Sequence, residues 1–297
     1  MNRKRQADKA SHKPRDQRRR EARAAAIMGP LNQVREQYAN NWATGHAEHF
    51  SAQGDYEWMA GFLDGCPRIV EVGAGNGSGT IALCRRGAVV VGIEKNPFCL
   101  QIAERKLREA GIPVVVEPRG TVVPDEDATS FEITYPRISS QLPTEGALLL
   151  GGDVTIDREL VSWLVAHAPF DGIACWNIGT YRLNLDVTSD PSEYRLIVQN
   201  RVYEMAERVL RPGGVLHVVD RGREPTKENV QAMVESQLDG HRDQASTTSL
   251  RVDPNIQYRV YEPPPENTGI SMQAADTSSF EFNSNRMAFW SIASRKP

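Results

Sequence analysis

The 297-residue chain has no long hydrophobic run. No apolar stretch approaches the ~18 residues that a helix needs to cross a bilayer. The basic residues at the start are not followed by the apolar segment that a secretory signal contains. We therefore expect a cytoplasmic protein that makes no membrane contact.

Cysteine is also scarce, with four residues in the whole chain. Cys66, Cys84, Cys99 and Cys175 lack the paired spacing of a zinc site and are too few for a disulfide framework in a chain of this length. We expect reduced thiols in the interior and no bound metal.

Positive charge is concentrated at one end of the chain. Residues 1–23 hold ten Lys and Arg against three Asp and Glu, although the whole chain has a net charge of -3. Without large apolar residues, residues 1–28 are predicted to form a basic tail that is disordered or marginally helical. Two roles stay open for this tail: a solubilising extension, or a contact with nucleic acid or another acidic partner through phosphate groups. The acidic remainder argues against extensive docking of nucleic acid.

The rest of the chain is long enough, and with 40% hydrophobic residues apolar enough, for one elaborated α/β domain. Within residues 29–65, Leu31, Val34, Tyr38 and Trp42 follow a near-helical spacing, and residues 55–64 form a second helical pattern. We expect lid helices there, followed by a ligand-binding domain over residues 66–297.

The most informative stretch is VEVGAGNGSGT, residues 70–80. A short β-branched strand at residues 68–72 runs into Glu71, Gly73, Gly75 and Gly77, which form the pattern E-x-G-x-G-x-G. Glycines at alternate positions let the chain turn sharply and let a ligand lie against bare backbone before the next helix begins. The pattern predicts a crevice at the carboxyl end of the strand.

A dinucleotide site is the rival interpretation, and it requires G-x-G-x-x-G so that the pyrophosphate meets the helix N-terminus. Ser78 stands where the third glycine of that pattern is needed. Alternate spacing suits a ligand without a pyrophosphate, and Glu71 inside the motif suits a cationic one.

With these motifs the chain resembles the class I S-adenosylmethionine (SAM)-dependent methyltransferases. The resemblance implies a doubly wound, mostly parallel seven-stranded sheet with helices on both faces and an antiparallel C-terminal strand. It also implies that SAM is the cofactor, that Glu71 lies near its methionine ammonium group, and that Gly73, Ala74, Gly75 and Gly77 form the backbone side of its pocket.

Further acids stand at predicted strand ends. Glu94 ends the strand at residues 88–94, about twenty residues beyond the glycines, where a ribose-binding carboxylate is expected, with Lys95 beside it. The resemblance assigns adenine contacts to Asp153 and Val154, after the apolar run at residues 147–150.

Residues 112–145 are predicted to be an insertion. Its strand-like runs at residues 114–116 and 131–135 suggest a β-hairpin appended to the sheet. If residues 114–117 were instead the third strand of the core, Glu117 would take the adenine role of Asp153.

The later motifs fit the same family. Residues 170–176 form a fourth buried strand that ends at Asn177, and an Arg-Pro-Gly-Gly turn at residues 211–214 precedes a fifth. The motif from Asn177 to Tyr181 lacks the two prolines that enzymes methylating an exocyclic DNA amine use. Residues 256–262 and 287–294 are consistent with the reversed hairpin that ends such domains.

We therefore predict a SAM-dependent methyltransferase that acts on an oxygen or nitrogen of a small-molecule acceptor. Methyl transfer requires an aligned nucleophile, and a general base where the acceptor carries a proton. His46, His49, Tyr181 and Asp220 are candidates for that base, and Asn177 lines the methyl-transfer end. Two alternatives remain: a methyltransferase of RNA or protein that uses the basic tail, and a nucleotide-binding regulatory or oxidoreductase domain.

Overall fold

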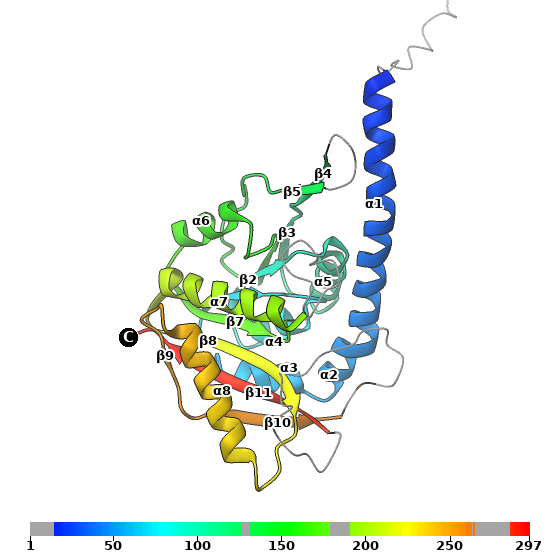
Figure 1. Ribbon diagram of the computed structural model, residues 1–297. Coiled ribbons are helices and arrows are strands. Elements are labelled where there is room, and N and C mark those ends of the chain that lie inside the picture. Colours follow the sequence, from blue (N-terminus) through cyan, green and yellow to red (C-terminus); the bar gives the residue numbers. More distant parts are fainter. Residues whose placement is uncertain (1–14, 126–130, 179–190, 263, 265–285) are drawn as a thin grey trace, which may run out of the picture.

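The computed structural model describes residues 15–125, 131–178, 191–262, 264 and 286–297. Its centre is a mixed sheet with the strand order β10-β11-β8-β7-β1-β2-β6-β3, in which the short β9 also pairs with β11 (Figure 1). The strands are β1 Arg68–Val72, β2 Val89–Glu94, β3 Val114–Glu117, β6 Ala147–Gly151, β7 Phe170–Trp176, β8 Leu210–Arg223, β9 Arg251–Val252, β10 Gln257–Tyr261 and β11 Met287–Arg295.

Strands β3, β6, β2, β1, β7 and β8 pair in parallel, whereas β11 lies antiparallel between β8 and β10. The predicted doubly wound sheet with its antiparallel C-terminal strand is therefore confirmed. The sheet has two strands more than the predicted seven. Strand β3 extends it beyond β6, and the short β9 pairs with β11.

Helices cover both faces of the sheet, which explains the nearly continuous apolar strands. Alternate residues of β1 point to opposite faces: Val70 packs in a cluster with α6 and α7, and Ile69 in a second cluster with α3, α4 and α5. The bounds of these helices are α3 Asp55–Gly61, α4 Ser78–Arg85, α5 Pro97–Glu109, α6 Arg158–Ala166 and α7 Pro191–Val209; α8, Val230–Ala245, packs on β11.

The insertion differs from the prediction in its strand pairing. Residues 114–117 form β3 in the main sheet, and the partner of β5 (Phe131–Thr134) is β4 (Thr121–Pro124), a strand that the pattern did not reveal. The chain turns away from the sheet after β3, where Gly120 has a φ of +96°. Arg119 fixes this turn through a buried ion pair with Asp157, the N-cap of α6, at 2.7 Å.

The N-terminal region contains a long helix. A single helix, α1, runs from Arg15 to Asn41 and crosses the expected boundary at residue 28; residues 1–14 lie outside the described residues. Its alanine-rich middle favours the helix. A π-helix, η1 (Trp42–Ala47), and the short α2 (Glu48–Ala52) follow without a break.

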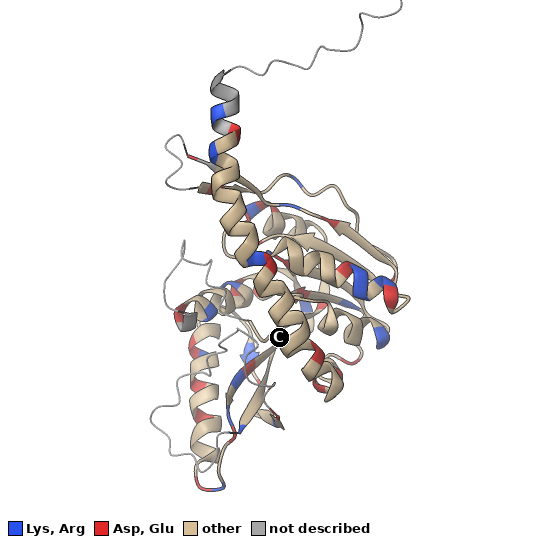
Figure 2. Ribbon diagram, turned by 90° about the vertical axis from the view of Figure 1, so that its right-hand side faces the viewer, with Lys and Arg blue, Asp and Glu red and all other residues tan. Residues whose placement is uncertain are grey.

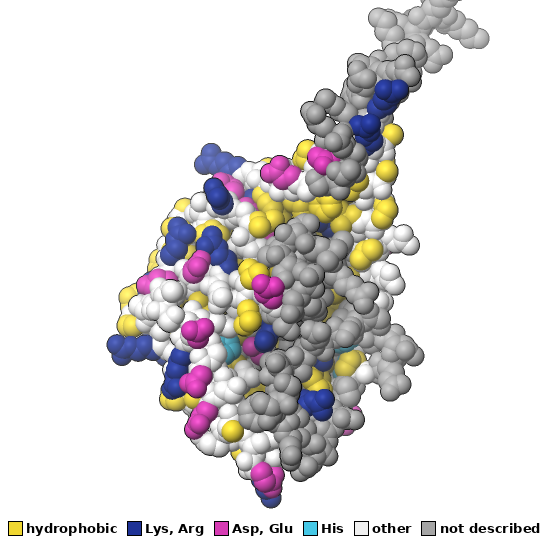
Figure 3. Space-filling model, viewed as in Figure 1, with side chains coloured by type: hydrophobic (Ala, Val, Ile, Leu, Met, Phe, Trp, Pro, Cys, Tyr) yellow, Lys and Arg dark blue, Asp and Glu magenta, His cyan; other side chains and the backbone are white. Residues whose placement is uncertain are grey.

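The start of α1 projects beyond the body of the fold (Figure 1). Basic residues are frequent on this projecting part, as Figure 2 shows, whereas acidic and basic side chains are mixed over the body in Figure 3. Among the described helices, none combines the length and hydropathy required to span a bilayer.

Candidate functional site

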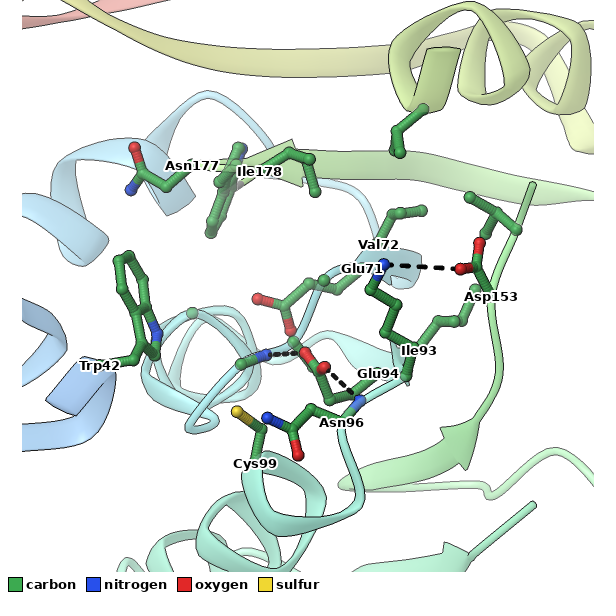
Figure 4. Close-up of a pocket in the computed structure, with 18 of the residues that line it drawn as sticks. Trp42, Glu71, Val72, Ile93, Glu94, Asn96, Cys99, Asp153, Asn177 and Ile178 are labelled. Atoms are coloured by element: carbon green, nitrogen blue, oxygen red, sulfur yellow. Dashed lines mark hydrogen bonds and ion pairs between the residues drawn. The ribbon is translucent and has the colours of Figure 1, made fainter. Parts of the chain in front are cut away.

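A cavity lies at the carboxyl ends of β1, β2, β6 and β7 and is shown in Figure 4. It occupies about 890 Å³, including the part open to solvent. From β1 the chain proceeds to β2 on one side and eventually to β7 on the other, so the crevice forms where the strand order reverses. Open α/β sheets bind their ligands at this position.

The glycine loop after β1 forms the floor of the cavity. The backbone N–H groups of Gly73 and Ala74 both donate to the Ile93 carbonyl, at 2.9 and 3.0 Å. Gly73 and Gly75 have positive φ angles of 78° and 54°, and a Cβ on Gly73 would lie 2.8 Å from the Ile178 side chain. Only glycine fits this turn without strain.

Two later glycines have different functions. Gly77 does not line the cavity; a Cβ there would lie 3.0 Å from Ala103, so this glycine permits close packing of α4 on α5. Gly79 does line the cavity, and a Cβ there would lie 2.2 Å from Glu71 Oε1. The sequence pattern selected Gly77, which lies outside the cavity lining, and did not select Gly79, which occurs two residues later in the same alternation and lines the cavity.

Glu94 closes the loop against the next strand. Its Oε2 accepts a hydrogen bond from the Gly75 N–H at 2.9 Å, and its Oε1 accepts one from the Asn96 N–H at 2.8 Å. Burial raises the pKa of Glu94, and these two bonds oppose that shift. Each carboxylate oxygen still has a lone pair that can accept from a ligand hydroxyl.

Glu71 is a buried acid in the wall of the same cavity, 3% exposed. The Thr80 hydroxyl donates to its Oε2 at 2.5 Å. Burial raises its pKa to about 8, and among the described residues no ion pair with a basic side chain opposes this. A cation bound beside Glu71 would lower the pKa again.

Asp153 lies at the opposite end of the cavity from Asn177 (Figure 4). Its Oδ1 accepts from the Thr155 N–H and hydroxyl at 2.9 and 2.6 Å, and its Oδ2 lies 3.6 Å from Lys95 Nζ. Lys95 also donates to the Tyr194 hydroxyl at 2.5 Å. The predicted residues Lys95 and Val154 line the cavity. Tyr194 of α7 also lines it, although no sequence pattern indicated this residue.

The alternative residue at this end, Glu117, does not line the cavity. It lies at the end of the edge strand β3, and its carboxylate accepts from the backbone N–H groups of Ser139 and Ser140. These bonds lower its pKa. The structure brings Asp153, and not Glu117, next to Glu94 and Lys95.

Aromatic rings form the remaining walls. Tyr38 and Trp42 come from the N-terminal helices, Tyr56 from α3 and Trp176 from the end of β7. Asn177 follows Trp176 with a φ of 51°, a left-handed conformation that is uncommon for a residue other than glycine. The sequence had suggested Asn177 but gave no reason to select Tyr56 or Trp176.

The predicted base candidates that the structure describes do not line the cavity. His46 is buried and stacks on Trp42, and burial lowers its pKa to about 4. The His49 ring is within hydrogen-bonding distance of the Glu262 carbonyl, at 2.8 Å. Asp220 forms an ion pair with Arg195 at 2.8 Å, which lowers its pKa despite its burial. Tyr181 lies outside the described residues.

No protein-family model and no curated protein matches the chain. Solved structures of similar fold include the magnesium protoporphyrin IX methyltransferase of Synechocystis PCC 6803 with bound S-adenosylhomocysteine, at 10% identity and a TM-score of 0.45 over 93% of this chain and all of that chain. An O-methyltransferase from Bacillus cereus has 14% identity and a TM-score of 0.44 over 89% of this chain and 90% of that chain. At this distance the matches do not assign an activity.

Proposed function

We propose that this protein is a SAM-dependent methyltransferase that transfers a methyl group to an oxygen or nitrogen of a small-molecule acceptor. The observation that supports this most directly is the convergence of three acids on one cavity. Glu71, Glu94 and Asp153 lie at or near the carboxyl ends of three different strands, and all line the space above the glycine loop. A cationic nucleoside ligand would use all three.

The residues present fit SAM group by group. Glu71, an acid without a cationic partner among the described residues, suits the positively charged methionine end. Glu94 suits the ribose hydroxyls, and Asp153 with Val154 suits the adenine ring and its amino group. Bound SAM would supply an electrophilic methyl group on a sulfonium.

The aromatic end of the cavity suits the acceptor. Trp42, Tyr56 and Trp176 offer apolar faces there, and Asn177 offers an amide. Because none of the described base candidates lines the cavity, these residues would act chiefly by holding the acceptor nucleophile in line with the methyl group and by excluding water. A cavity covered by the lid helices favours a small molecule over a polymer.

Calorimetric titration of the protein with SAM, S-adenosylhomocysteine and NAD tests the cofactor. We expect binding of the first two, and no binding of NAD because Ser78 replaces the glycine that a pyrophosphate needs. A preference for NAD would contradict the proposal and favour a nucleotide-binding or oxidoreductase domain. Transfer of a radiolabelled methyl group to fractionated metabolites, RNA and protein would then identify the acceptor class.

The projecting basic part of α1 favours one alternative, an RNA or protein acceptor. Deletion of residues 1–23 separates the two possibilities. For a small-molecule acceptor we expect unchanged turnover and weak dependence on salt, because the deleted segment precedes all of the cavity residues. If the deletion lowers turnover, and if turnover of the full-length enzyme falls strongly as salt is added, the polymer acceptor is favoured.

A further inference from the structure

The cavity has three acids for a cationic ligand but little that binds an anion. Among the described residues that line it, Lys95 is the single basic side chain. Its Nζ lies 3.6 Å from Asp153 Oδ2 and donates to the Tyr194 hydroxyl at 2.5 Å. The methionine group of SAM is a zwitterion, with a carboxylate beside the ammonium group that we place near Glu71. That carboxylate therefore requires neutral hydrogen-bond donors when it leaves water.

The backbone of the glycine loop does not provide these donors. The N–H groups of Gly73 and Ala74 donate to the Ile93 carbonyl at 2.9 and 3.0 Å, and the N–H of Gly75 donates to Glu94 Oε2 at 2.9 Å. All three loop residues line the cavity, and all three use their donors within the protein. A side-chain donor is therefore needed at this loop.

Few side-chain donors of the cavity wall are open to a ligand at the Glu71 end. Three amide and indole donors have partners in the protein: Asn96 Nδ2 donates to the Arg35 carbonyl at 3.0 Å, Trp176 Nε1 to His217 Nδ1 at 2.8 Å and Asn177 Nδ2 to Met59 Sδ at 3.9 Å. Tyr38 interacts electrostatically with Tyr194, at the end proposed for adenine. Two donors of the lid helices remain, Trp42 Nε1 and the Tyr56 hydroxyl.

Trp42 lies directly against the glycine loop. The residue is 7% exposed, and its Nε1 lies 3.0 Å from the position that a Cβ would take on Gly75. Figure 4 shows the nitrogen on the edge of the ring that faces this loop. Among the described residues, no acceptor forms a hydrogen bond with Nε1, and the residue lines the cavity. An indole N–H can only donate, so it suits an anionic or neutral acceptor.

Packing fixes the orientation of the Trp42 ring. The His46 imidazole stacks on it, with ring centres 5.5 Å apart and planes inclined by 12°, and Phe50 meets it edge-on at 6.4 Å. Trp42 also begins the π-helix η1, and short π-helical segments occur often at functional sites. A donor that is already held in place loses little conformational entropy when a ligand binds to it.

The Tyr56 hydroxyl is less suited to a carboxylate. Among the charged groups, Glu71 acts on it most strongly, ahead of Asp55 and Arg221. A carboxylate bound at this hydroxyl would lie beside an acid and be repelled, whereas an ammonium group would be attracted. Tyr56 therefore suits the ammonium side of the ligand.

We propose that Trp42 Nε1 binds the carboxylate of the cofactor's methionine group, so that the lid recognises the amino-acid end of SAM. This inference rests on the proposed function and extends it to a contact beyond those of Glu71 and the glycine loop. The two charges of the zwitterion then have separate partners: the acid binds the ammonium group, and the indole N–H binds the carboxylate.

Calorimetric titration with SAM and with decarboxylated SAM tests this contact, because the second ligand keeps the ammonium group and lacks the carboxylate. We expect the wild type to bind SAM on the order of tenfold more tightly than decarboxylated SAM. Trp42→Phe keeps an aromatic ring and removes the N–H. In this variant the ratio of the two affinities should fall to about one, even if the smaller ring weakens both ligands alike.

Trp58→Phe is the matched control. Trp58 lies on the lid helix α3, packs on Phe62 with ring centres 5.1 Å apart and does not line the cavity. This variant should keep the affinity ratio of the wild type. Tyr56→Phe should also keep the preference for SAM over decarboxylated SAM, because its hydroxyl is assigned to the ammonium side.

If Trp42→Phe does not fold, the wild type itself provides the test. Its five tryptophans give separate indole N–H signals in the NMR spectrum of the ¹⁵N-labelled full chain. We expect one of these signals to shift on addition of SAM and to remain in place on addition of decarboxylated SAM. Indole signals that respond to both ligands alike would overturn the inference.

The calorimetric results that contradict the inference are equally definite. They are an equal or higher affinity of the wild type for decarboxylated SAM, an unchanged ratio in Trp42→Phe, and a ratio that Trp58→Phe also abolishes. A preference that is lost in Tyr56→Phe and kept in Trp42→Phe would assign the carboxylate to Tyr56 instead. A wild type that binds neither ligand is a separate failure, because it contradicts the proposed function itself.

Discussion

The two ends of the cavity differ in how their polar groups are satisfied. At the end proposed for the nucleoside, called the nucleotide end below, Glu94, Lys95 and Asp153 already have hydrogen-bond partners in the chain. At the end proposed for the acceptor, called the acceptor end below, Oδ1 of Asn177 is buried and has no hydrogen-bond partner among the described residues. The comparison teaches that the chain itself satisfies the charged side chains at one end of the cavity, whereas it leaves an amide oxygen at the other end without a donor.

The physical reason lies in the elements that carry each end. Glu94 and Asp153 lie at or just after the ends of the neighbouring parallel strands β2 and β6, which the sheet register holds in place. Asn177 comes from a left-handed backbone position just after β7. Substitutions at the two ends should therefore have opposite effects on stability.

The largest effect is expected for Gly79→Ala, which would break the nucleotide end. The added Cβ would lie 2.2 Å from Glu71 Oε1, so the carboxylate or the helix has to move. We expect the free energy of unfolding to fall by about 2 kcal/mol or more, together with a loss of measurable SAM binding. Gly240→Ala in α8, where a Cβ meets nothing within 4 Å, is the control and should be neutral or stabilising in chemical denaturation.

Glu94→Ala should weaken SAM binding by about 1.5–3 kcal/mol and also destabilise the fold by roughly 1–2 kcal/mol, because two backbone N–H groups lose their acceptor. Glu117→Ala is the matched control, since it also removes a carboxylate that accepts two backbone N–H groups, but away from the cavity. Calorimetry should show unchanged SAM affinity for that control. If Glu117→Ala lost SAM affinity and Glu94→Ala did not, Glu117 and not Glu94 would be the acid that binds SAM.

Glu71→Gln should change proton linkage more than structure. With its pKa at about 8, Glu71 is protonated in the free protein at pH 7, and a bound cation would ionise it. We expect SAM binding to release about one proton more from the wild type than from the variant, measured calorimetrically in buffers of different ionisation enthalpy. Equal proton release would show that no cation binds beside this acid.

The same residue predicts a pH effect on stability without ligand. The folded pKa of Glu71 lies above the ordinary value of 4.5, so between 4.5 and about 8 the unfolded chain binds fewer protons at this group than the native chain does. The wild type should therefore lose stability relative to Glu71→Gln as the pH rises through this window. Denaturation at pH 5 and pH 8 measures the difference.

The smallest effect is expected for Asn177→Gly, which sharpens the contrast at the acceptor end. Glycine adopts the positive φ of this position more readily than asparagine does, and it removes the buried unpartnered Oδ1. We expect the free energy of unfolding to rise by about 0.5–1 kcal/mol, while methyl transfer becomes slower. A destabilised variant would mean that Asn177 supports the fold.

Much of the nucleotide end could be predicted because its signals are local. A buried strand followed by an acid or by alternating glycines identifies Glu71, Gly73, Gly75 and Glu94 within short stretches of sequence. The acid at residue 153 required a choice between two strands, since both 114–117 and 147–151 are apolar. Pairing with β2 made that choice, and no local pattern contains it.

The acceptor end had no comparable signal. Tyr56 and Trp176 belong to a helix and a strand that are distant in the sequence, and the local pattern identifies each only as a core residue. The histidines were conspicuous by residue type, yet His46 packs behind the wall and His49 binds the Glu262 carbonyl. Residue type alone therefore overestimated the histidines.

The sequence by itself determined the layered α/β fold, the glycine turn and the acids near it, because strand burial and backbone freedom depend on residues adjacent in the chain. Only the tertiary structure decided which edge strand pairs where, which glycine touches Glu71, and which charged groups are left without partners. Those properties depend on distances between elements far apart in the sequence, and packing alone sets such distances.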